Sequence, residues 1–487
     1  MRRDRYLTGQ RSLITGGRRF KSRGRRVRRH DPQGGAAPRQ ARLDLALTTL
    51  YSRAVTEIGY GRRRQGDIYL AGVRGRKPRV PQNPTALERA ARRAMSKEGF
   101  AYIAGSAGLE TTTSANRAAF DRVRIVPRML RGAATRNLEV ELLGRTLAAP
   151  LLIAPVGVLE MAHRDADLAV ARAAAAEGVP MIFSSQASRP LEECSAVMAD
   201  APRWFQLYMS TSDDLVRSFV ARAERCGCDA IVVTLDTTML GWRLRDLDLA
   251  YLPFLVGKGI SQYVTDPVFQ RLVDAAAPPE RGPVTPAAIR ALWRLARAYP
   301  GSTWRNLRSP RPRQAVRTFL DVFARPSLEW KDLAPLRDAT NLPILLKGIL
   351  HPDDARRALD EGADGIVVSN HGGRQVDGAI ASLDALPPIV EAVGGRAPVL
   401  LDSGIRGGAD VFKALALGAT AVLIGRPYCY GLAVAGEAGV REVLQNLVAD
   451  FDLTMGLAGC ATLADIDLNS VTLDGPPRPH SASTLTT

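Results

Sequence analysis

Cysteine is scarce in this chain, and the placement of the few cysteines excludes common uses of that residue. The 487 residues include five cysteines, at positions 194, 226, 228, 429 and 460, with no C-x-x-C pair. An odd number cannot all pair in disulfides, and Cys226-Gly227-Cys228 is too tightly spaced for a usual zinc pair. We therefore expect reduced, buried thiols in a cytoplasmic protein, and no metal site.

Long apolar runs and aromatic residues are also lacking. The longest apolar run, residues 148–158, is too short to span a bilayer and is interrupted by Pro150 and Pro155, so no transmembrane helix is expected. Aromatic residues make up only 6% of the chain, whereas Ala, Gly and Val are abundant, which favours α/β layers over an all-β sandwich. The length allows one large domain with appendages, or two or three ordinary domains.

Acidic residues are nearly absent from the first part of the chain. Residues 1–64 hold 18 Lys and Arg but 4 Asp and Glu, so they carry most of the net charge of +17. This leader has no apolar core of the length that a secretory signal needs. It can be a disordered tail or an over-long reading frame, a segment that contacts anionic lipid or nucleic acid, or a targeting peptide. Nucleic-acid binding is not expected, because the leader has no recognisable groove-reading element or stacking aromatics.

Short apolar runs alternate with segments of helical length over most of the remaining chain, after a first helical run at 85–98. Eight strands are predicted, at 151–154, 180–184, 204–207, 230–234, 344–347, 365–369, 399–402 and 421–424. Continuous apolar strands alternating with helices indicate a parallel sheet covered by helices, and eight such units favour a (β/α)8 TIM barrel. We expect this domain at 65–470, with an insertion at 237–330 after the fourth strand and a disordered tail at 471–487. The insertion is far longer than a normal connection, which is typical of a functional lid or a partly disordered segment.

Polar residues follow nearly every predicted strand. In a barrel of this kind the carboxyl ends of the strands form the active-site face, so these residues should converge. After the seventh and eighth strands stand Asp402-Ser403-Gly404-Ile405-Arg406 and Gly425-Arg426. Glycines and helix N-termini let a phosphate approach backbone N–H groups, and the two arginines can pair with it directly.

Two strand-end side chains indicate the chemistry. Lys347 ends the fifth strand, where it can be a salt-bridged lysine or a cation beside an electron-rich cofactor ring; its site-like neighbours favour the second interpretation. His371 follows the sixth strand in Ser369-Asn370-His371-Gly372-Gly373-Arg374-Gln375. A lone histidine is more often structural, but a base beside a carboxylate-binding guanidinium is what proton removal from a 2-hydroxy acid requires.

These motifs resemble the FMN-dependent α-hydroxy-acid oxidising family, over roughly 65–465. The resemblance rests on 369–375, 402–408 and Gly425-Arg426-Pro427. Within the family the chain is most similar to the lactate 2-monooxygenases, through 241–247, 263–270 and 347–357 and through the large insertion itself. The family resemblance implies FMN as cofactor, a small L-2-hydroxy acid and O2 as substrates, and a homo-oligomer of four or more subunits.

The resemblance also implies residue roles. His371 is the active-site base, Asp236 supports its imidazolium, and Tyr208 lies near the substrate hydroxyl. Three residues are expected to hold the substrate: Tyr102, Arg243 and Arg374. The residues expected to hold the flavin are Ala154, Pro155, Val156, Gly157, Ser184, Gln206, Thr234, Lys347 and Ser369. Asp402 is expected at the ribityl chain, and the phosphate is expected on Gly404, Arg406, Gly425 and Arg426.

The product is left open by the sequence. His371 takes a proton while two electrons pass to the flavin, as hydride or through a carbanion. If pyruvate stays bound while peroxide forms, the products of lactate are acetate, CO2 and water; early release gives pyruvate and H2O2, and a quinone-linked dehydrogenase is a third outcome. Gly157 stands where many oxidases carry Ala, and the missing methyl is expected to leave room near the flavin. Ser106 stands where the family usually has Gly, so the loop after Tyr102 is expected to be tighter or slightly displaced.

Overall fold

Eight parallel strands close into a barrel in the computed structural model, which describes residues 59–277 and 285–473. Around the barrel the strands follow the order β10-β11-β4-β5-β6-β7-β8-β9, so chain neighbours are also spatial neighbours. Their bounds are β4 (Leu151–Ile153), β5 (Met181–Phe183), β6 (Arg203–Leu207), β7 (Ile231–Thr234), β8 (Ile344–Ile349), β9 (Gly365–Val368), β10 (Val399–Leu401) and β11 (Ala421–Ile424). All eight predicted strands, and the predicted barrel, are confirmed.

The barrel strands are apolar along their whole length because both of their faces are buried. One set of side chains fills the barrel interior, including Leu152, Ile182, Val232, Leu345 and Leu423. The alternate set packs outward against the surrounding helices. This two-sided burial is what produces continuous apolar runs instead of a polar–apolar alternation. The hairpin of β2 (Val140–Leu142) and β3 (Arg145–Leu147) adds Leu142 and Leu147 to the interior cluster.

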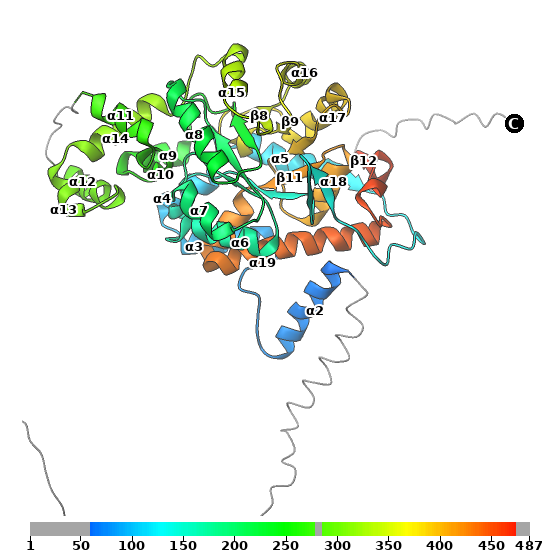
Figure 1. The fold of residues 1–487 in the computed structure, drawn as a ribbon. Helices are drawn as coiled ribbons and strands as arrows, with labels where there is room; N and C mark the ends of the chain where they lie inside the picture. Colours follow the sequence, from blue (N-terminus) through cyan, green and yellow to red (C-terminus); the bar gives the residue numbers. More distant parts are fainter. Residues whose placement is uncertain (1–58, 278–284, 474–487) are drawn as a thin grey trace, which may run out of the picture. The chain divides into compact units, whose positions relative to one another are not determined.

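Helices cover the outside of the barrel (Figure 1). Those in the barrel repeat are α6 (Ala166–Glu177), α7 (Leu191–Met198), α8 (Asp213–Arg225), α15 (Ala334–Asp338), α16 (Pro352–Asp360), α17 (Ser382–Val393), α18 (Gly408–Ala416) and α19 (Arg426–Ala458). The last helix has non-helical backbone at Ala435 and Gly436, so a short helix beginning at Arg426 precedes the long one. That short helix starts directly at the end of β11, at the barrel mouth.

Among the described residues, four helices precede the barrel: α2 (Tyr60–Val73), α3 (Pro84–Ala94), α4 (Lys97–Ala104) and α5 (Thr111–Arg122). The helix predicted at 85–98 is two helices, because Ser96 caps α4 by accepting a hydrogen bond from the Gly99 N–H. Helix α2 begins at Tyr60, inside the segment 1–64 predicted as the leader, and residues 1–58 lie outside the described residues. At the other end, β12 (Val471–Leu473) pairs with β1 (Val123–Ile125) inside the segment predicted as the tail.

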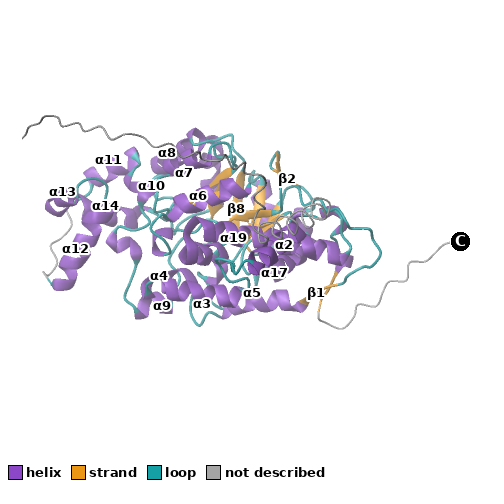
Figure 2. Ribbon diagram, turned by 90° about the horizontal axis from the view of Figure 1, so that it is seen from below, coloured by secondary structure: helices purple, strands orange, loops and turns teal. Residues whose placement is uncertain are grey.

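The insertion after β7 is mostly helical. It contains α9 (Leu244–Asp248), α10 (Ser261–Val264), α11 (Pro267–Ala275), α12 (Pro286–Ala298), α13 (Thr303–Arg308) and α14 (Arg311–Val322), with the 3-10 turn η2 (Pro253–Val256). These helices lie together beside the barrel (Figure 2). Their core is aromatic: the Tyr263 ring meets Phe319 of α14 at 4.8 Å and Phe219 of α8 at 5.0 Å between centroids. The described part of the insertion is therefore ordered and packed against α8.

No helix in the described ranges is both long enough and apolar enough to cross a lipid bilayer.

Candidate active site

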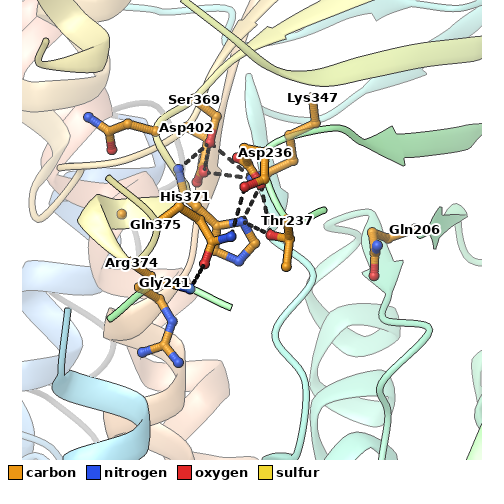
Figure 3. Close-up of polar contacts among 12 residues, drawn as sticks. Gln206, Asp236, Thr237, Gly241, Lys347, Ser369, His371, Arg374, Gln375 and Asp402 are labelled. Carbon is orange, nitrogen blue, oxygen red and sulfur yellow. Dashed lines mark hydrogen bonds and ion pairs between the residues drawn. The ribbon is translucent and has the colours of Figure 1, made fainter. Parts of the chain in front are cut away.

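His371 lines a cavity at the carboxyl ends of the barrel strands, and Asp236 contacts its imidazole (Figure 3). His371 follows β9, Asp236 follows β7, and Nδ1 of the imidazole lies 2.7 Å from Oδ1 of the carboxylate. The Thr237 hydroxyl lies 3.0 Å from the same carboxylate oxygen. The hydrogen bond through Nδ1 leaves the second ring nitrogen, Nε2, as the one available to a substrate.

Electrostatics prepare this pair for proton transfer. Burial lowers the pKa of His371 below its usual range, although the negative charge of Asp236 works in the opposite direction. Burial by itself raises the pKa of Asp236, but the charges of His371 and Lys347 lower it to about 2. At neutral pH the imidazole is therefore uncharged beside an ionised carboxylate, which is the state that a general base needs before it accepts a proton.

A second buried network joins three neighbouring strands. The Lys347 ammonium at the end of β8 donates to the Ser369 hydroxyl at 2.9 Å and lies 3.1 Å from Oδ2 of Asp402. Ser369 in turn donates to Asp402 at 2.6 Å, and its oxygen accepts a hydrogen bond from the His371 N–H. Burial raises the pKa of Asp402, but the lysine charge outweighs it and lowers that pKa below the usual range. The ion pair with Asp402 is what the first interpretation of Lys347 predicts; Lys347 also lines the cavity, and its role beside a cofactor ring stays a prediction.

The substrate-binding residues predicted from the sequence come together on one side of the cavity. Tyr102, Tyr208, Arg243 and Arg374 all line it. The Arg374 guanidinium lies 5.1 Å from the Tyr102 ring centroid and donates to the Gly105 carbonyl, whereas Arg243 donates to the Gln375 side chain at 3.1 Å. Burial raises the pKa of Tyr208, so its hydroxyl stays protonated at neutral pH.

Burial lowers the pKa of Arg243 to about 10. No carboxylate lies within ion-pair distance of it in the part of the chain that the structure describes. A buried guanidinium without a carboxylate is a site for an anionic ligand, here the carboxylate of a substrate.

Two more arginines that line the cavity have no carboxylate partner among the described residues, and Arg426 shares the Gly105 carbonyl with Arg374. Burial lowers the pKa of Arg406, and it lowers that of Arg426 to about 10. Arg426 begins its helix at the end of β11, and Gly404 near β10 has a φ of 98°, a conformation that only glycine adopts freely. Together with Gly425, these residues line the cavity, and their role as a phosphate site stays a prediction.

Two buried polar atoms at the strand ends are left without a partner by the protein, and they fit a planar cofactor bound there. Nε2 of Gln206, at the end of β6, and the Thr234 hydroxyl, at the end of β7, are buried without a hydrogen-bond partner among the described residues. The Ser184 hydroxyl donates to the side-chain oxygen of Gln206, and Ser184 is not among the residues that line the cavity. Unpaired buried donors are rare unless a ligand satisfies them, so the residues fit a flavin with its phosphate on Arg406 and Arg426.

The two departures from the family pattern have structural consequences. The expectation that Gly157 leaves empty space was wrong: a Cβ placed there lies 2.9 Å from the Gln186 Cβ, so the Gln186 side chain already occupies that side. The Ser106 hydroxyl accepts a hydrogen bond from Arg426 at 2.8 Å and lies 2.6 Å from the Thr113 hydroxyl. Ser106 thus ties the loop after Tyr102 to the phosphate end of the cavity.

Sequence reasoning missed four residues at the site. Gln186 lines the cavity with a buried, unpartnered Nε2, and Ser403 accepts a hydrogen bond from the Gly372 N–H at 2.8 Å. Gln375 donates to the Asp236 and Met239 carbonyls, which joins the His371 loop to the insertion. Thr237 is the fourth. Gln186 follows β5 and Ser403 follows β10, at strand ends where polar residues were expected to converge, but no role was predicted for either.

Comparisons with known proteins agree with this geometry. A family model described as FMN-dependent dehydrogenase matches residues 91–473. The chain is 42% identical over 402 residues to an FMN-dependent alpha-hydroxy acid dehydrogenase of Penicillium citrinum, covering 82% of this chain and 93% of that protein. It is 40% identical to an L-lactate oxidase of Lysinibacillus sphaericus, covering 84% and 96%.

A solved structure of mandelate oxidase is similar with a TM-score of 0.65 and 37% identity, covering 81% of this chain and 98% of that one. The sequence matches, the barrel and the arginine-lined cavity lead to one conclusion. The chain belongs to the FMN-dependent dehydrogenase family, is an oxidoreductase of 2-hydroxy acids, and uses FMN.

Proposed function

We propose that this enzyme oxidises L-lactate with O2 and releases acetate, CO2 and water. The proposal rests on the segments that supply the two arginines expected to bind the substrate carboxylate. Arg243 stands in the insertion after β7, whereas Arg374 follows β9. Gln375 fastens these two loops by donating to the Asp236 carbonyl at 2.7 Å and accepting from Arg243. An acid gripped by both arginines is therefore enclosed from two sides, and so is the keto acid formed from it.

The chain's own residues divide the work of oxidation. Arg243 and Arg374 orient the carboxylate, and the neutral hydroxyls of Tyr102 and Tyr208 hydrogen-bond the substrate. His371 accepts a proton at Nε2, and the ionised carboxylate of Asp236 stabilises the imidazolium that results. When bound, FMN supplies the acceptor for the two electrons that leave the substrate.

Retention of the keto acid decides the products. Oxidation of lactate by O2 gives pyruvate and H2O2, and a second reaction between these two gives acetate, CO2 and water. The second reaction is fast only if both products stay within one cavity. The insertion supplies Thr237, Leu240 and Arg243 to the cavity wall, which supports its role as the lid that delays release.

The test is the product balance from purified enzyme, L-lactate and air. Acetate equal to the lactate consumed, with little free peroxide, is the expected result, and added catalase should not change it. Pyruvate and peroxide in equal amounts would show the oxidase reaction instead. Turnover only with an added quinone would show a dehydrogenase. Bleaching of bound flavin by L-lactate without oxygen is the control, because it occurs in all three cases and fails only if lactate is not the substrate.

A cytoplasmic location and a homo-oligomeric state stay predictions from the sequence and the family.

A further inference from the structure

The helices α12, α13 and α14 carry a concentration of positive charge that the active site does not use. Residues 286–320 contain eight arginines and no acidic residue, although residues 65–487 as a whole are close to neutral. The rest of this region is therefore net negative, and the charge is segregated onto one part of the insertion. Seven of the eight arginines are exposed: Arg290, Arg294, Arg297, Arg305, Arg308, Arg313 and Arg317. None of the seven has an acidic partner among the described residues, while the eighth, Arg311, pairs with Asp274.

Large apolar side chains are exposed on the same helices. Ile289 and Trp293 of α12 are 57% and 47% exposed, and Trp304 of α13 is 72% exposed. Ile289 and Trp293 are four residues apart, so they share one helix face. Arg290, Arg294 and Arg297 follow the adjacent face, with the Arg297 guanidinium 4.6 Å from the Trp293 ring. The opposite side of α12 is buried through Leu295, which lies against Gly257 of the insertion.

We propose that α12 and α13 bind this enzyme to the surface of an anionic lipid bilayer. Arginines attract anionic headgroups, and tryptophan and isoleucine beside them enter the boundary between headgroups and acyl chains. Both figures show α12 and α13 at the outer end of the insertion. None of the residues of α12 and α13 lines the active-site cavity.

Other partners fit this surface less well. A second copy of the same surface would bring like charges together, because no acidic residue lies within 286–320. Nucleic acid would use the arginines and could stack on the tryptophans, but it offers no apolar phase for Ile289. A bilayer with anionic headgroups uses all three features at once. The proposal is independent of which products the enzyme releases.

The experiment uses the full-length, FMN-loaded enzyme and vesicles of phosphatidylcholine with or without phosphatidylglycerol. Co-sedimentation is expected only with the anionic vesicles, and it should weaken as salt is raised. Replacing Arg290, Arg294 and Arg297 with Gln should lower the partition constant roughly tenfold or more. A flavin spectrum and lactate-bleaching rate equal to wild type would show that the variant is folded.

Tryptophan fluorescence separates this surface from the basic leader, which contains no tryptophan. Lipids brominated in the acyl chains should quench the fluorescence of the wild-type enzyme. The Trp293→Phe/Trp304→Phe variant should lose most of that quenching, whereas the matched Trp242→Phe variant, altered at another exposed tryptophan, should keep it.

Three results would overturn the proposal. The first is vesicle binding in which the quenching is the same with and without Trp293 and Trp304; this result would assign the binding to the leader. The second is self-association that is lost in the Trp293→Phe/Trp304→Phe variant, and the third is binding to RNA or DNA, but not to vesicles, that depends on the three arginines.

Discussion

Nδ1 of His371 lies 2.7 Å from Oδ1 of Asp236, although the two residues are 135 positions apart in the chain. The barrel brings the ends of β9 and β7 to the same mouth, and this places an ionised carboxylate behind an uncharged imidazole. The pair predicts the pH dependence of the reaction.

Asp236→Asn should lower kcat about 10²- to 10⁴-fold, because the amide cannot stabilise the imidazolium formed when His371 accepts a proton. In the wild type kcat/KM should rise with pH as His371 loses its proton, with an apparent pKa below about 6.5 because burial lowers it. Removing the negative charge of Asp236 lowers that pKa further, so the acid limb should move to lower pH. His351→Gln, at an exposed histidine, is the control. An unchanged pH profile in Asp236→Asn would show that the charge of Asp236 does not influence the pKa of His371.

Lys347→Met should destabilise the apoprotein by about 3–5 kcal/mol, because it leaves the Asp402 carboxylate buried without its cation. Urea unfolding at pH 7 measures this loss. The folded-state pKa of Asp402 is lowered, so its contribution is present above the unfolded pKa of about 4 and is lost as pH falls through the folded value. The acid dependence of unfolding should therefore be shallower in the variant. The double variant Lys347→Met/Asp402→Asn should recover part of the stability; a double variant less stable than the single one would contradict this account.

Arg406→Met should weaken FMN binding much more than riboflavin binding. Its guanidinium is buried at the phosphate end of the cavity, and riboflavin has no phosphate to pair with it. We expect FMN affinity to fall by roughly 10- to 100-fold, in line with the loss of one charge-assisted contact. Flavin fluorescence titration of apoprotein measures both ligands. Arg396→Gln, on the outer surface, is the matched control, and equal losses for FMN and riboflavin would place the phosphate elsewhere.

Gly157→Ala should cost about 1–3 kcal/mol of stability, because the added methyl lies 2.9 Å from the Gln186 Cβ in a closely packed wall. The double variant Gly157→Ala/Gln186→Ala should regain most of it, since the second change removes the crowded side chain. Thermal unfolding of the two variants, with Gln186→Ala alone as reference, measures the coupling. Additive effects would mean that the two residues do not compete for the same space. The acetate-to-peroxide ratio of the single variant shows in addition whether this wall affects retention of the keto acid.

The eight barrel strands were predictable because burial on both faces leaves only apolar residues in them, a pattern visible in one dimension. The strand-end residues were predictable for a related reason: polar groups that follow buried strands at one end must meet at the barrel mouth. Helix α2 and β12, near the predicted boundaries at 64 and 471, owe their order to contacts with distant segments, which a one-dimensional pattern does not record.

The residues that sequence reasoning missed act through contacts between loops. Gln375 belongs to the motif 369–375, but its role shows only in the fold, where it joins the His371 loop to the insertion because both loops end at one mouth. Gln186 stood in a segment already recognised as site-like, but its role depends on its packing against Gly157, which no periodicity records.

The sequence by itself determined the barrel and the family, and local patterns suffice for these because burial, glycine freedom and charge act on neighbouring residues. The catalytic, carboxylate-binding and phosphate-binding residues stay predictions, several of them implied by the family resemblance alone. Only the tertiary structure decided which side chain fills the space at Gly157, how Ser106 reaches Arg426, and that Asp236 lies behind His371 with the geometry of a proton-transfer pair. Those relationships depend on ångström-scale distances between segments more than a hundred residues apart, except for the Gly157–Gln186 contact, and the fold alone sets such distances.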